Sequence, residues 1–292
     1  MTLLKTNKLI NLKGKLYSFE YPKVMGILNL SPDSFYDGGS WLNVERAVSH
    51  ALQMHEDGAF LIDIGAFTSK PGSSMISENE EENRLFPVLE LLNKKNSEII
   101  ISVDTCRAGI AKKVVNRYDV AIINDISCGN FDPDMFECIA QLKVPYVLMH
   151  IQGSPLNMQV KPIYQNVVKE VVKTLSEKIS HLNRLGVNDI IIDPGFGFGK
   201  SIENNFELLR NLEYFHLFEK ILLVGISRKS MIYKTLNVAP SDALCGTISL
   251  NMVALMKGAN IIRVHDVKEA VQTVTIFQKL YPTKIETDCY TY

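Results

Sequence analysis

The chain has 292 residues, of which 46% are hydrophobic and 22% charged, a composition typical of a globular protein. Its 31 lysines and arginines balance 32 acidic residues, and the net charge of -1 excludes a protein that binds nucleic acid or an anionic membrane mainly through bulk positive charge. No apolar run approaches the ~18 residues of a membrane span, and the first residues lack the apolar core of a signal peptide. The five cysteines form no C-x-x-C pair, so we expect a reduced, cytoplasmic protein without a disulfide framework or a structural zinc site.

The two ends of the chain differ from its middle. Residues 11–15 (NLKGK) have the composition of a tight turn, so we expect residues 1–22 to form a short β-hairpin that plugs one end of the fold. Residues 283–292 show no periodicity and are expected to be a loosely held tail. The sequence therefore predicts one main domain over residues 23–282.

Eight short apolar runs follow one another along this domain. They lack the strict alternation of a half-exposed strand, as expected for parallel strands that are buried on both faces. The runs are residues 24–28, 60–64, 99–103, 120–123, 145–149, 190–192, 221–226 and 261–264.

The segments between these runs have the periodicity of amphipathic helices. The clearest are residues 43–56, 167–185 and 242–257, and we expect Ser241 to cap the last of them. Each is followed by a glycine that leads into the next run, namely Gly58, Gly186 and Gly258. Eight strand–helix units in about 250 residues predict a single-domain (β/α)8 TIM barrel rather than an open doubly wound sheet.

Polar side chains end every one of the eight runs. They are Asn29, Asp63, Asp104, Asn124 with Asp125, His150, Asp193, residues 227–229, and Arg263 with His265. In this fold the catalytic and binding residues lie at the carboxyl ends of the strands. Burying an unpaired charge there costs several kcal/mol of folding free energy, so a full ring of polar strand ends indicates a ligand site. The mixture suits a ligand with a polar heterocycle at one end and an anion at the other. Asp63, Asp125 and His150 are equally compatible with bonding their own loops.

Two segments carry candidate ligand sites. Residues 193–201 (DPGFGFGKS) are not a P-loop, because Pro194 stands where its first glycine belongs; we expect their glycines to let the backbone approach a flat ligand, with Phe198 as a stacking face. Residues 227–230 (SRKS) open the helix after the seventh strand, where backbone amides and two cations predict an anion site. Arg263 and His265 are two residues apart, so their side chains share one face of the eighth strand.

These motifs closely resemble those of the dihydropteroate synthase family. The matching segments are MGILNLSPDSF (25–35), NDI (124–126), DPGFGFGK (193–200), SRKS (227–230) and RVHDV (263–267). The resemblance covers residues 22–280 in the family's order. It implies a transferase of folate biosynthesis that joins 4-aminobenzoate to 6-hydroxymethyl-7,8-dihydropterin diphosphate, with Mg²⁺, and releases diphosphate. It also implies a homodimer packed through the last helices, around residues 242–257 and 269–279.

The resemblance also implies a role for each matching residue. Asn29 would help to hold Mg²⁺, and Arg263 and His265 would grip the diphosphate. The pterin pocket would be formed by Asp104, Asn124, Ile126, Met149, Asp193, Phe198, Gly225 and Lys229. The 4-aminobenzoate would lie against Ser230, under the first two loops with Phe35, Ser69 and Lys70. An arylamine is a nucleophile at neutral pH without a strong base, so the residues' task is to stabilise the departing diphosphate in an SN1-like path.

One segment departs from the family pattern. The family's second loop usually has the sequence GGESTRPG, whereas this chain has GAFTSKPG at residues 65–72. Lys70 keeps the charge of the usual arginine but loses its planar fork. Phe67 replaces the usual acid, so we expect the loss of a hydrogen bond that anchors this loop.

Two other functions compete with this one. A methyltetrahydrofolate:corrinoid methyltransferase would share the pterin carboxylates but has no use for the cations at residues 227–229, 263 and 265. A non-catalytic, synthase-like protein that binds a pterin is expected to lose first the residues of the loops or those that bind diphosphate. In this chain, only the altered second loop favours that alternative.

Overall fold

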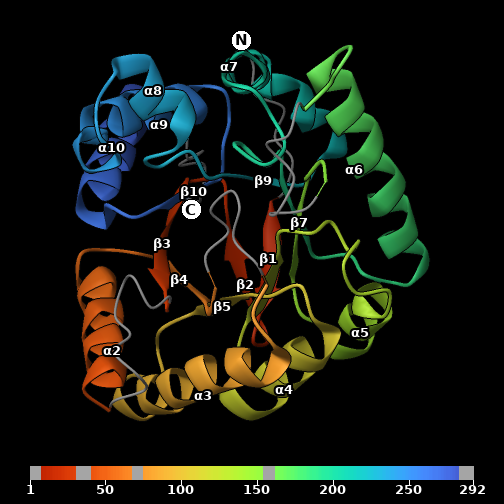
Figure 1. Ribbon diagram of the computed structural model, residues 1–292, viewed down its shortest axis with the longest axis vertical. Coiled ribbons are helices and arrows are strands. Elements are labelled where there is room, and N and C mark those ends of the chain that lie inside the picture. The colour runs from red at the N-terminus through yellow and green to blue at the C-terminus, as the bar shows by residue number, and fades with distance from the viewer. Residues whose placement is uncertain (1–7, 31–40, 68–74, 154–161, 283–292) are drawn as a thin grey trace, which may run out of the picture.

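The computed structural model describes residues 8–30, 41–67, 75–153 and 162–282 of the chain. Eight parallel strands close into a barrel in the order β10-β3-β4-β5-β6-β7-β8-β9 (Figure 1). Their bounds are β3 (Lys23–Asn29), β4 (Leu61–Gly65), β5 (Ile101–Asp104), β6 (Ile122–Asp125), β7 (Tyr146–Met149), β8 (Ile190–Asp193), β9 (Ile221–Val224) and β10 (Ile261–Val264). The predicted (β/α)8 barrel is confirmed.

Helices surround the barrel on its outside (Figure 1). They are α2 (Trp41–Glu56), α3 (Glu78–Lys95), α4 (Ala108–Tyr118), α5 (Met135–Leu142), α6 (Val167–Arg184), α7 (Ile202–Arg210), α8 (Ser230–Leu236), α9 (Leu244–Met256) and α10 (Val267–Leu280), with 3₁₀ turns η1 (Leu212–Phe218) and η2 (Pro240–Asp242). Among the residues that the structure describes, no helix has the length and apolar character needed to cross a membrane.

Each of the eight predicted apolar runs overlaps one strand of the barrel, but the boundaries differ. The runs at residues 99–103 and 120–123 begin two residues before β5 and β6, and the run at 221–226 continues past the end of β9. Conversely, β5, β6 and β8 extend onto Asp104, Asp125 and Asp193, because backbone pairing continues through a residue whose side chain is polar. The strands therefore carry their acidic side chains directly to the carboxyl end of the barrel.

The predicted glycine exits from the helices are confirmed. Gly58, Gly186 and Gly258 have φ angles of 99°, 83° and 87°, in the left-handed region that glycine adopts without a steric penalty. The expected cap at Ser241 is wrong. Ser241 lies inside η2, which begins at Pro240, and α9 begins only at Leu244. Proline favours the first position of a helical turn, and here it starts a separate turn before the helix.

The N-terminal hairpin closes the amino end of the barrel. Strands β1 (Leu9–Leu12) and β2 (Lys15–Ser18) pair antiparallel around Lys13 and Gly14, which both have positive φ, as a type I′ turn requires. Apolar hairpin side chains pack onto the barrel's interior floor; the hairpin residues are Ile10, Leu12 and Phe19. The amide of Asn260, just before β10, donates to the Phe19 carbonyl (3.0 Å) and accepts from Lys8 (2.7 Å). The hairpin thus covers the amino end of the barrel.

Candidate active site at the carboxyl end of the barrel

A polar network fills the carboxyl end of the barrel, and Asp63 is its centre. The Oδ1 atom of Asp63 accepts from the hydroxyl of Ser102 (2.6 Å), and its Oδ2 atom accepts from the Asn124 amide (2.8 Å) and from Nε of Arg263 (2.7 Å). Asp63 and Ser102 are fully buried. Since both oxygens of Asp63 accept from protein donors, this carboxylate orients Ser102, Asn124 and Arg263.

Arg263 joins this network to a second carboxylate. Its Nη2 atom lies 3.3 Å from Oδ2 of Asp104, and its Nη1 atom has no partner among the described residues. The carboxylates of Asp63 and Asp104 raise the pKa of Arg263, although burial of the guanidinium group acts in the opposite direction. Two of its three nitrogens are therefore fixed by the protein, and one is left to hold an anion.

The Asp104 carboxylate is only half satisfied. Its Oδ1 atom is buried without a hydrogen-bond partner. Burial, followed by the nearby charge of Asp63, raises the pKa of Asp104, while Arg263 opposes that rise. A buried oxygen without a partner is costly, so this atom is suited to a ligand that brings a donor, such as a ring N–H or an amino group.

Asp193 and Lys229 face each other across the same space. The Oδ1 atom of Asp193 accepts from the backbone N–H of Gly195 (2.7 Å); burial raises the pKa of this carboxyl, and the charge of Lys229 opposes that rise. Lys229 donates to the Phe196 carbonyl, and its Nζ atom lies 4.6 Å from the centre of the Phe198 ring. Burial lowers the pKa of Lys229 to about 8, although Asp193 favours its charged form. The two side chains thus supply an acceptor and a donor at the same end of the barrel.

An apolar cluster borders these polar groups. It contains Phe67, Cys106, Ile126, Met149, Ile151 and Phe198, all of them buried. Phe67 replaces the acid of the family pattern, and the structure shows that the position is apolar. Phe67 packs against the other members of this cluster, so apolar contacts hold the start of the second loop.

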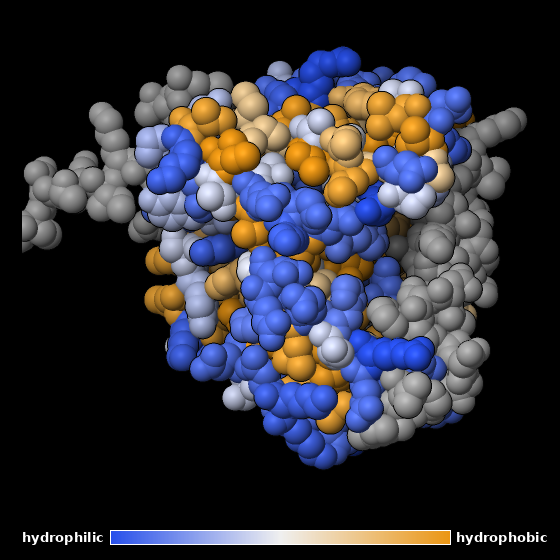
Figure 2. Space-filling model, turned by 90° about the vertical axis from the view of Figure 1, so that its left-hand side faces the viewer, coloured by the Kyte–Doolittle hydropathy of each residue, from blue (hydrophilic) through white to orange (hydrophobic). Residues whose placement is uncertain are grey.

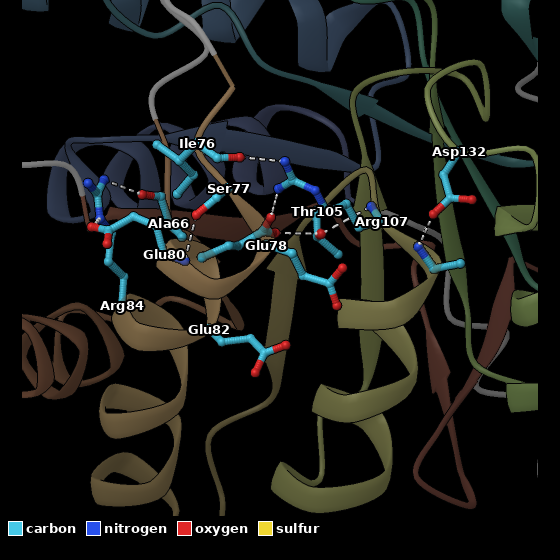
Figure 3. Close-up of polar contacts among 12 residues, drawn as sticks. Ala66, Ile76, Ser77, Glu78, Glu80, Glu82, Arg84, Thr105, Arg107 and Asp132 are labelled. Atoms are coloured by element: carbon cyan, nitrogen blue, oxygen red, sulfur yellow. Dashed lines mark hydrogen bonds and ion pairs between the residues drawn. The ribbon is translucent and has the colours of Figure 1, made fainter.

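The backbone around Phe67 is also held by two arginines (Figure 3). Arg84 on α3 donates to the carbonyl of Ala66 (3.0 Å), and Arg107 donates to the carbonyl of Ile76. Arg107 also pairs with Glu81, which is fully buried and accepts from the hydroxyl of Thr105 (2.6 Å). These contacts fix both ends of the segment between β4 and α3. Sequence reasoning missed them, because none of these residues ends a strand.

The segment after β8 differs from its expected role. Gly195, Gly197 and Gly199 have positive φ. A Cβ atom on Gly195 would lie 1.8 Å from the His150 carbonyl oxygen. A Cβ atom on Gly199 would lie 2.4 Å from the Gln152 carbonyl oxygen. They permit close contact with the protein's own backbone, so the expectation that they approach a flat ligand is wrong for these two positions. The Lys200 ammonium group is buried and donates to the Gly195 carbonyl (2.8 Å), which agrees with the rejection of a P-loop.

Two of the residues that the sequence left open bond within the protein. The carboxylate of Asp125 accepts from the hydroxyl of Tyr146 (2.5 Å) and from the backbone N–H groups of Ser127 and Gly129. Nδ1 of His150 lies 3.0 Å from Nζ of Lys200. Both residues are buried and organise their own loops.

The anion site predicted at residues 227–230 contains one cation fewer than expected. Arg228 has a left-handed backbone (φ 54°), and its guanidinium group forms a two-bond pair with Asp266 (2.9 and 2.7 Å). It also donates to the carbonyls of Pro240 and Ser241. Arg228 is therefore a structural cross-link, and Lys229 is the cation of this segment that faces the site.

The remaining candidates lie around the rim. Asn29 ends β3 and pairs with Gly65 of β4, and its side chain is partly exposed with no hydrogen-bond partner in the described part of the chain. Gly225 follows β9, and a Cβ atom there would touch Cβ of Arg263 at 3.7 Å. Ser230 is the first residue of α8. Phe35, Ser69 and Lys70 lie outside the described residues, as does the tail at 283–292.

The carboxyl end of this barrel carries two buried carboxyl groups, a lysine and an arginine nitrogen without a partner in the described ranges, a donor set that fits a pterin-binding enzyme. The family model of pterin binding enzymes matches residues 25–265. The chain is 41% identical to dihydropteroate synthase of Escherichia coli (strain K12) over 274 residues, which are 93% of this chain and 96% of that protein.

Solved structures agree with this comparison. The Yersinia pestis dihydropteroate synthase in a sulfonamide drug complex superposes with a TM-score of 0.86 at 40% identity, covering 93% of this chain and 98% of that one. The Xanthomonas albilineans enzyme with 4-aminobenzoic acid gives a TM-score of 0.87 at 34% identity, covering 95% and 100%. The chain belongs to the dihydropteroate synthase family, which is a family of transferases.

Proposed function

We propose that this chain condenses 4-aminobenzoate with 6-hydroxymethyl-7,8-dihydropterin diphosphate, giving 7,8-dihydropteroate and diphosphate. The observation that supports this most directly is the buried, unpartnered oxygen of Asp104 beside the free Nη1 atom of Arg263. A substrate that carries both a hydrogen-bond donor and an anion satisfies both groups at once. We assign the reaction to the barrel of residues 23–282, with residues 1–22 as its hairpin extension. We also assign it to the cytoplasm, because a charged diphosphate substrate does not cross a membrane unaided.

The pterin ring would lie in the polar end of the barrel. Asp104 and Asp193 would accept hydrogen bonds from its ring N–H and amino groups, and Asn124, which is held by Asp63, would meet the same edge. Lys229 would donate to the ring's acceptor side. The faces of the ring would pack against Met149, Phe198 and Ile126, and the absence of a side chain at Gly225 would leave room beside Arg263.

The difficult step is the departure of diphosphate. The carbon–oxygen bond to the diphosphate breaks, and the electron-rich pterin shares the positive charge that develops on the exocyclic carbon. Arg263 would stabilise the negative charge on the departing group through Nη1, and His265, which follows β10, would donate to the same group. The arylamine nitrogen then forms the new bond and loses a proton to water. No protein base is needed, because this amine is uncharged at neutral pH.

The second substrate would lie nearer to the rim. The hydroxyl of Ser230 would donate to the carboxylate of 4-aminobenzoate, and Phe35, Ser69 and Lys70 would contact the same substrate. The similarity to the Xanthomonas relative, whose structure contains 4-aminobenzoic acid, supports this assignment.

The residues present are compatible with Mg²⁺ that is held largely by substrate. The Asn29 amide is partly exposed. Within the described ranges it has no hydrogen-bond partner, and no cluster of three or more His, Cys, Asp or Glu side chains suited to a metal occurs there. Mg²⁺ retains several waters and often uses only one or two protein ligands together with substrate phosphates, so Asn29 would be a sufficient protein contact. When bound, Mg²⁺ would neutralise part of the diphosphate charge.

We also propose a homodimer packed through α9 and α10. Apolar side chains gather in the upper part of the face shown in Figure 2, over α8, α9 and α10. Leu236, Met256, Ile276 and Leu280 there are each at least half exposed. An apolar patch of this kind is suited to a second copy of the chain. Sedimentation of the wild type and of Ile276→Lys tests this, with dimer expected only for the wild type.

The decisive experiment measures diphosphate release from the pterin diphosphate with and without 4-aminobenzoate and Mg²⁺. Release that requires both substrates and falls on addition of EDTA supports the synthase. Pterin binding without release would favour the non-catalytic alternative. Methyl transfer from methyltetrahydrofolate to a corrinoid would favour the methyltransferase, although the free Arg263 nitrogen argues against it.

A further inference from the structure

A buried serine contacts the proposed diphosphate-binding histidine. Ser227 is almost fully buried, and its Oγ atom lies 3.2 Å from the backbone nitrogen and 3.1 Å from Nδ1 of His265. One hydroxyl group therefore contacts both the main chain and the side chain of His265. No other hydrogen bond of Ser227 occurs among the described residues.

The hydrogen-bonding capacity of a hydroxyl group decides where the hydrogens lie. The backbone N–H of His265 can only donate, so Oγ of Ser227 accepts there. If Nδ1 also donated to Oγ, the serine hydrogen would be buried without an acceptor, which is costly. If Ser227 donates to Nδ1, every group is satisfied. The favoured arrangement has Nδ1 as acceptor, which leaves the hydrogen of a neutral imidazole on Nε2.

The charge of the ring is consistent with this arrangement. Burial, followed by the positive charge of Arg263, lowers the pKa of His265 to about 4. The free ring is therefore neutral at physiological pH, and the position of its single hydrogen matters. An Nε2–H group attracts a diphosphate oxygen, whereas an unprotonated Nε2 would present a lone pair and repel it.

The neighbouring residue holds the two segments together. Arg228, next to Ser227, pairs with Asp266, next to His265. The Arg228 backbone N–H also donates to the hydroxyl of Thr247 (3.0 Å) on α9. Two consecutive residues after β9 thus bind two consecutive residues after β10. This double contact fixes the turn that carries Lys229 relative to the strand end that carries Arg263.

We propose that Ser227 is a positioning residue for the transfer reaction: it holds His265 in the Nε2–H tautomer, with that hydrogen directed to the departing diphosphate. This inference rests on the proposed function for the role of the diphosphate, but the tautomer itself does not depend on it. Ser227 touches no reacting atom and acts only through His265.

The first test is nuclear magnetic resonance of ligand-free protein with ¹⁵N-labelled histidine. His265 is identified among the six histidines by the signals that are lost in His265→Gln. We expect the wild type to show an unprotonated Nδ1 and a protonated Nε2, and Ser227→Ala to shift this ring toward the Nδ1–H form. A wild-type ring with its hydrogen on Nδ1 would overturn the proposal, whether or not any variant folds.

The second test is kinetic. Loss of an outer partner of a functional histidine typically costs 10- to 100-fold, so we expect kcat of Ser227→Ala to fall by about that factor. We expect KM for 4-aminobenzoate to be unchanged and Ser227→Thr, which keeps the hydroxyl, to restore both the tautomer and most of kcat. Ser249→Ala is the matched control, since that hydroxyl bonds only the Cys245 carbonyl within α9.

The outcomes separate this proposal from the proposed function. If even the wild type releases no diphosphate, the proposed function fails, and the resonance experiment still decides the tautomer. If the wild type is active and Ser227→Ala keeps both its tautomer and its kcat, the positioning role is wrong while the synthase activity stands.

Discussion

The partly buried guanidinium group of Arg263 on β10 forms an ion pair with the fully buried carboxylate of Asp63 on β4, with Nε and Oδ2 2.7 Å apart. The residues are 200 positions apart in the sequence, and only closure of the barrel brings them together. This pair fixes Nε of Arg263, and Asp104 fixes Nη2 (3.3 Å), so two of the three guanidinium nitrogens are held in place before any substrate arrives. An oriented cation stabilises a departing anion without having to reorganise, which is the main electrostatic advantage of an enzyme over water.

Replacement of Asp63 by asparagine should disrupt this arrangement. Three donors converge on the carboxylate, from Ser102, Asn124 and Arg263, and an amide would set its own N–H against one of them. We expect the free energy of unfolding to fall by about 3 kcal/mol, as when a buried pair loses one partner. We expect kcat/KM for the pterin diphosphate to fall by on the order of 100-fold, or about 2.7 kcal/mol. Urea denaturation and steady-state kinetics measure the two effects.

Ser102→Ala is the matched control for this variant. It removes one donor from the same carboxylate but leaves the ion pair with Arg263 intact. A loss of only about 1 kcal/mol in unfolding free energy is expected. Equal effects of the two substitutions would contradict a special role for the ion pair.

The pH dependence of catalysis should report on Lys229. Its pKa is lowered to about 8 by burial, so the fraction of free enzyme with a protonated lysine decreases above that pH. Because only the protonated form carries the positive charge that favours the ring's acceptor side, we expect kcat/KM for the pterin diphosphate to decline as pH rises through about 8. The arginine of Lys229→Arg stays protonated, so this decline in kcat/KM should be absent from the measurable pH range. The overall activity of the variant should be lower than that of the wild type. A decline that persists in the arginine variant would belong to another group.

The stability of the protein in mild acid should depend on His265. Burial lowers its folded-state pKa to about 4, whereas the unfolded chain binds the proton near pH 6.5. Between these values the unfolded state holds more protons, so stability is lost as pH falls from about 6.5 toward 4. Each such proton contributes about 1.4 kcal/mol per pH unit. Unfolding free energies of His265→Gln should therefore vary less steeply with pH than those of the wild type, and parallel curves would contradict a buried neutral histidine.

The barrel could be predicted because its signals are local. A strand that is buried on both faces is a continuous apolar run, and a helix exit such as Gly58 needs the left-handed backbone that glycine allows. The cap at Ser241 could not be placed, because the competing turn begins one residue earlier at Pro240. Local patterns locate elements more reliably than they locate boundaries.

The sequence did not predict which strand-end residues bond within the protein and which keep polar atoms free for a ligand. Asp63 and Asp104 both follow apolar residues on neighbouring strands, yet the first is fully bonded within the protein and the second keeps a free oxygen. Arg228 and Lys229 are adjacent cations, and only the left-handed backbone and Asp266 separate their roles. Such differences depend on partners far away in the sequence, so a motif identifies the rim but not the use of each side chain.

Phe67 stands where the family pattern usually has an acid. The side chain is buried in the apolar cluster that includes Met149 and Phe198, beside the Ala66 carbonyl that Arg84 holds. We expect Phe67→Glu, which introduces the usual family residue, to destabilise the protein by about 3 kcal/mol or more, because an unpaired carboxylate would enter apolar surroundings. Phe67→Leu should cost only about 1 kcal/mol, since it keeps most of the apolar volume.

Urea denaturation of the two variants, together with KM for both substrates, tests this account of the second loop. If the glutamate variant is as stable as the leucine variant, a polar partner must be available to the carboxylate and the apolar anchor is not required. If the glutamate variant is unstable and the leucine variant is not, apolar packing of Phe67 holds this end of the second loop.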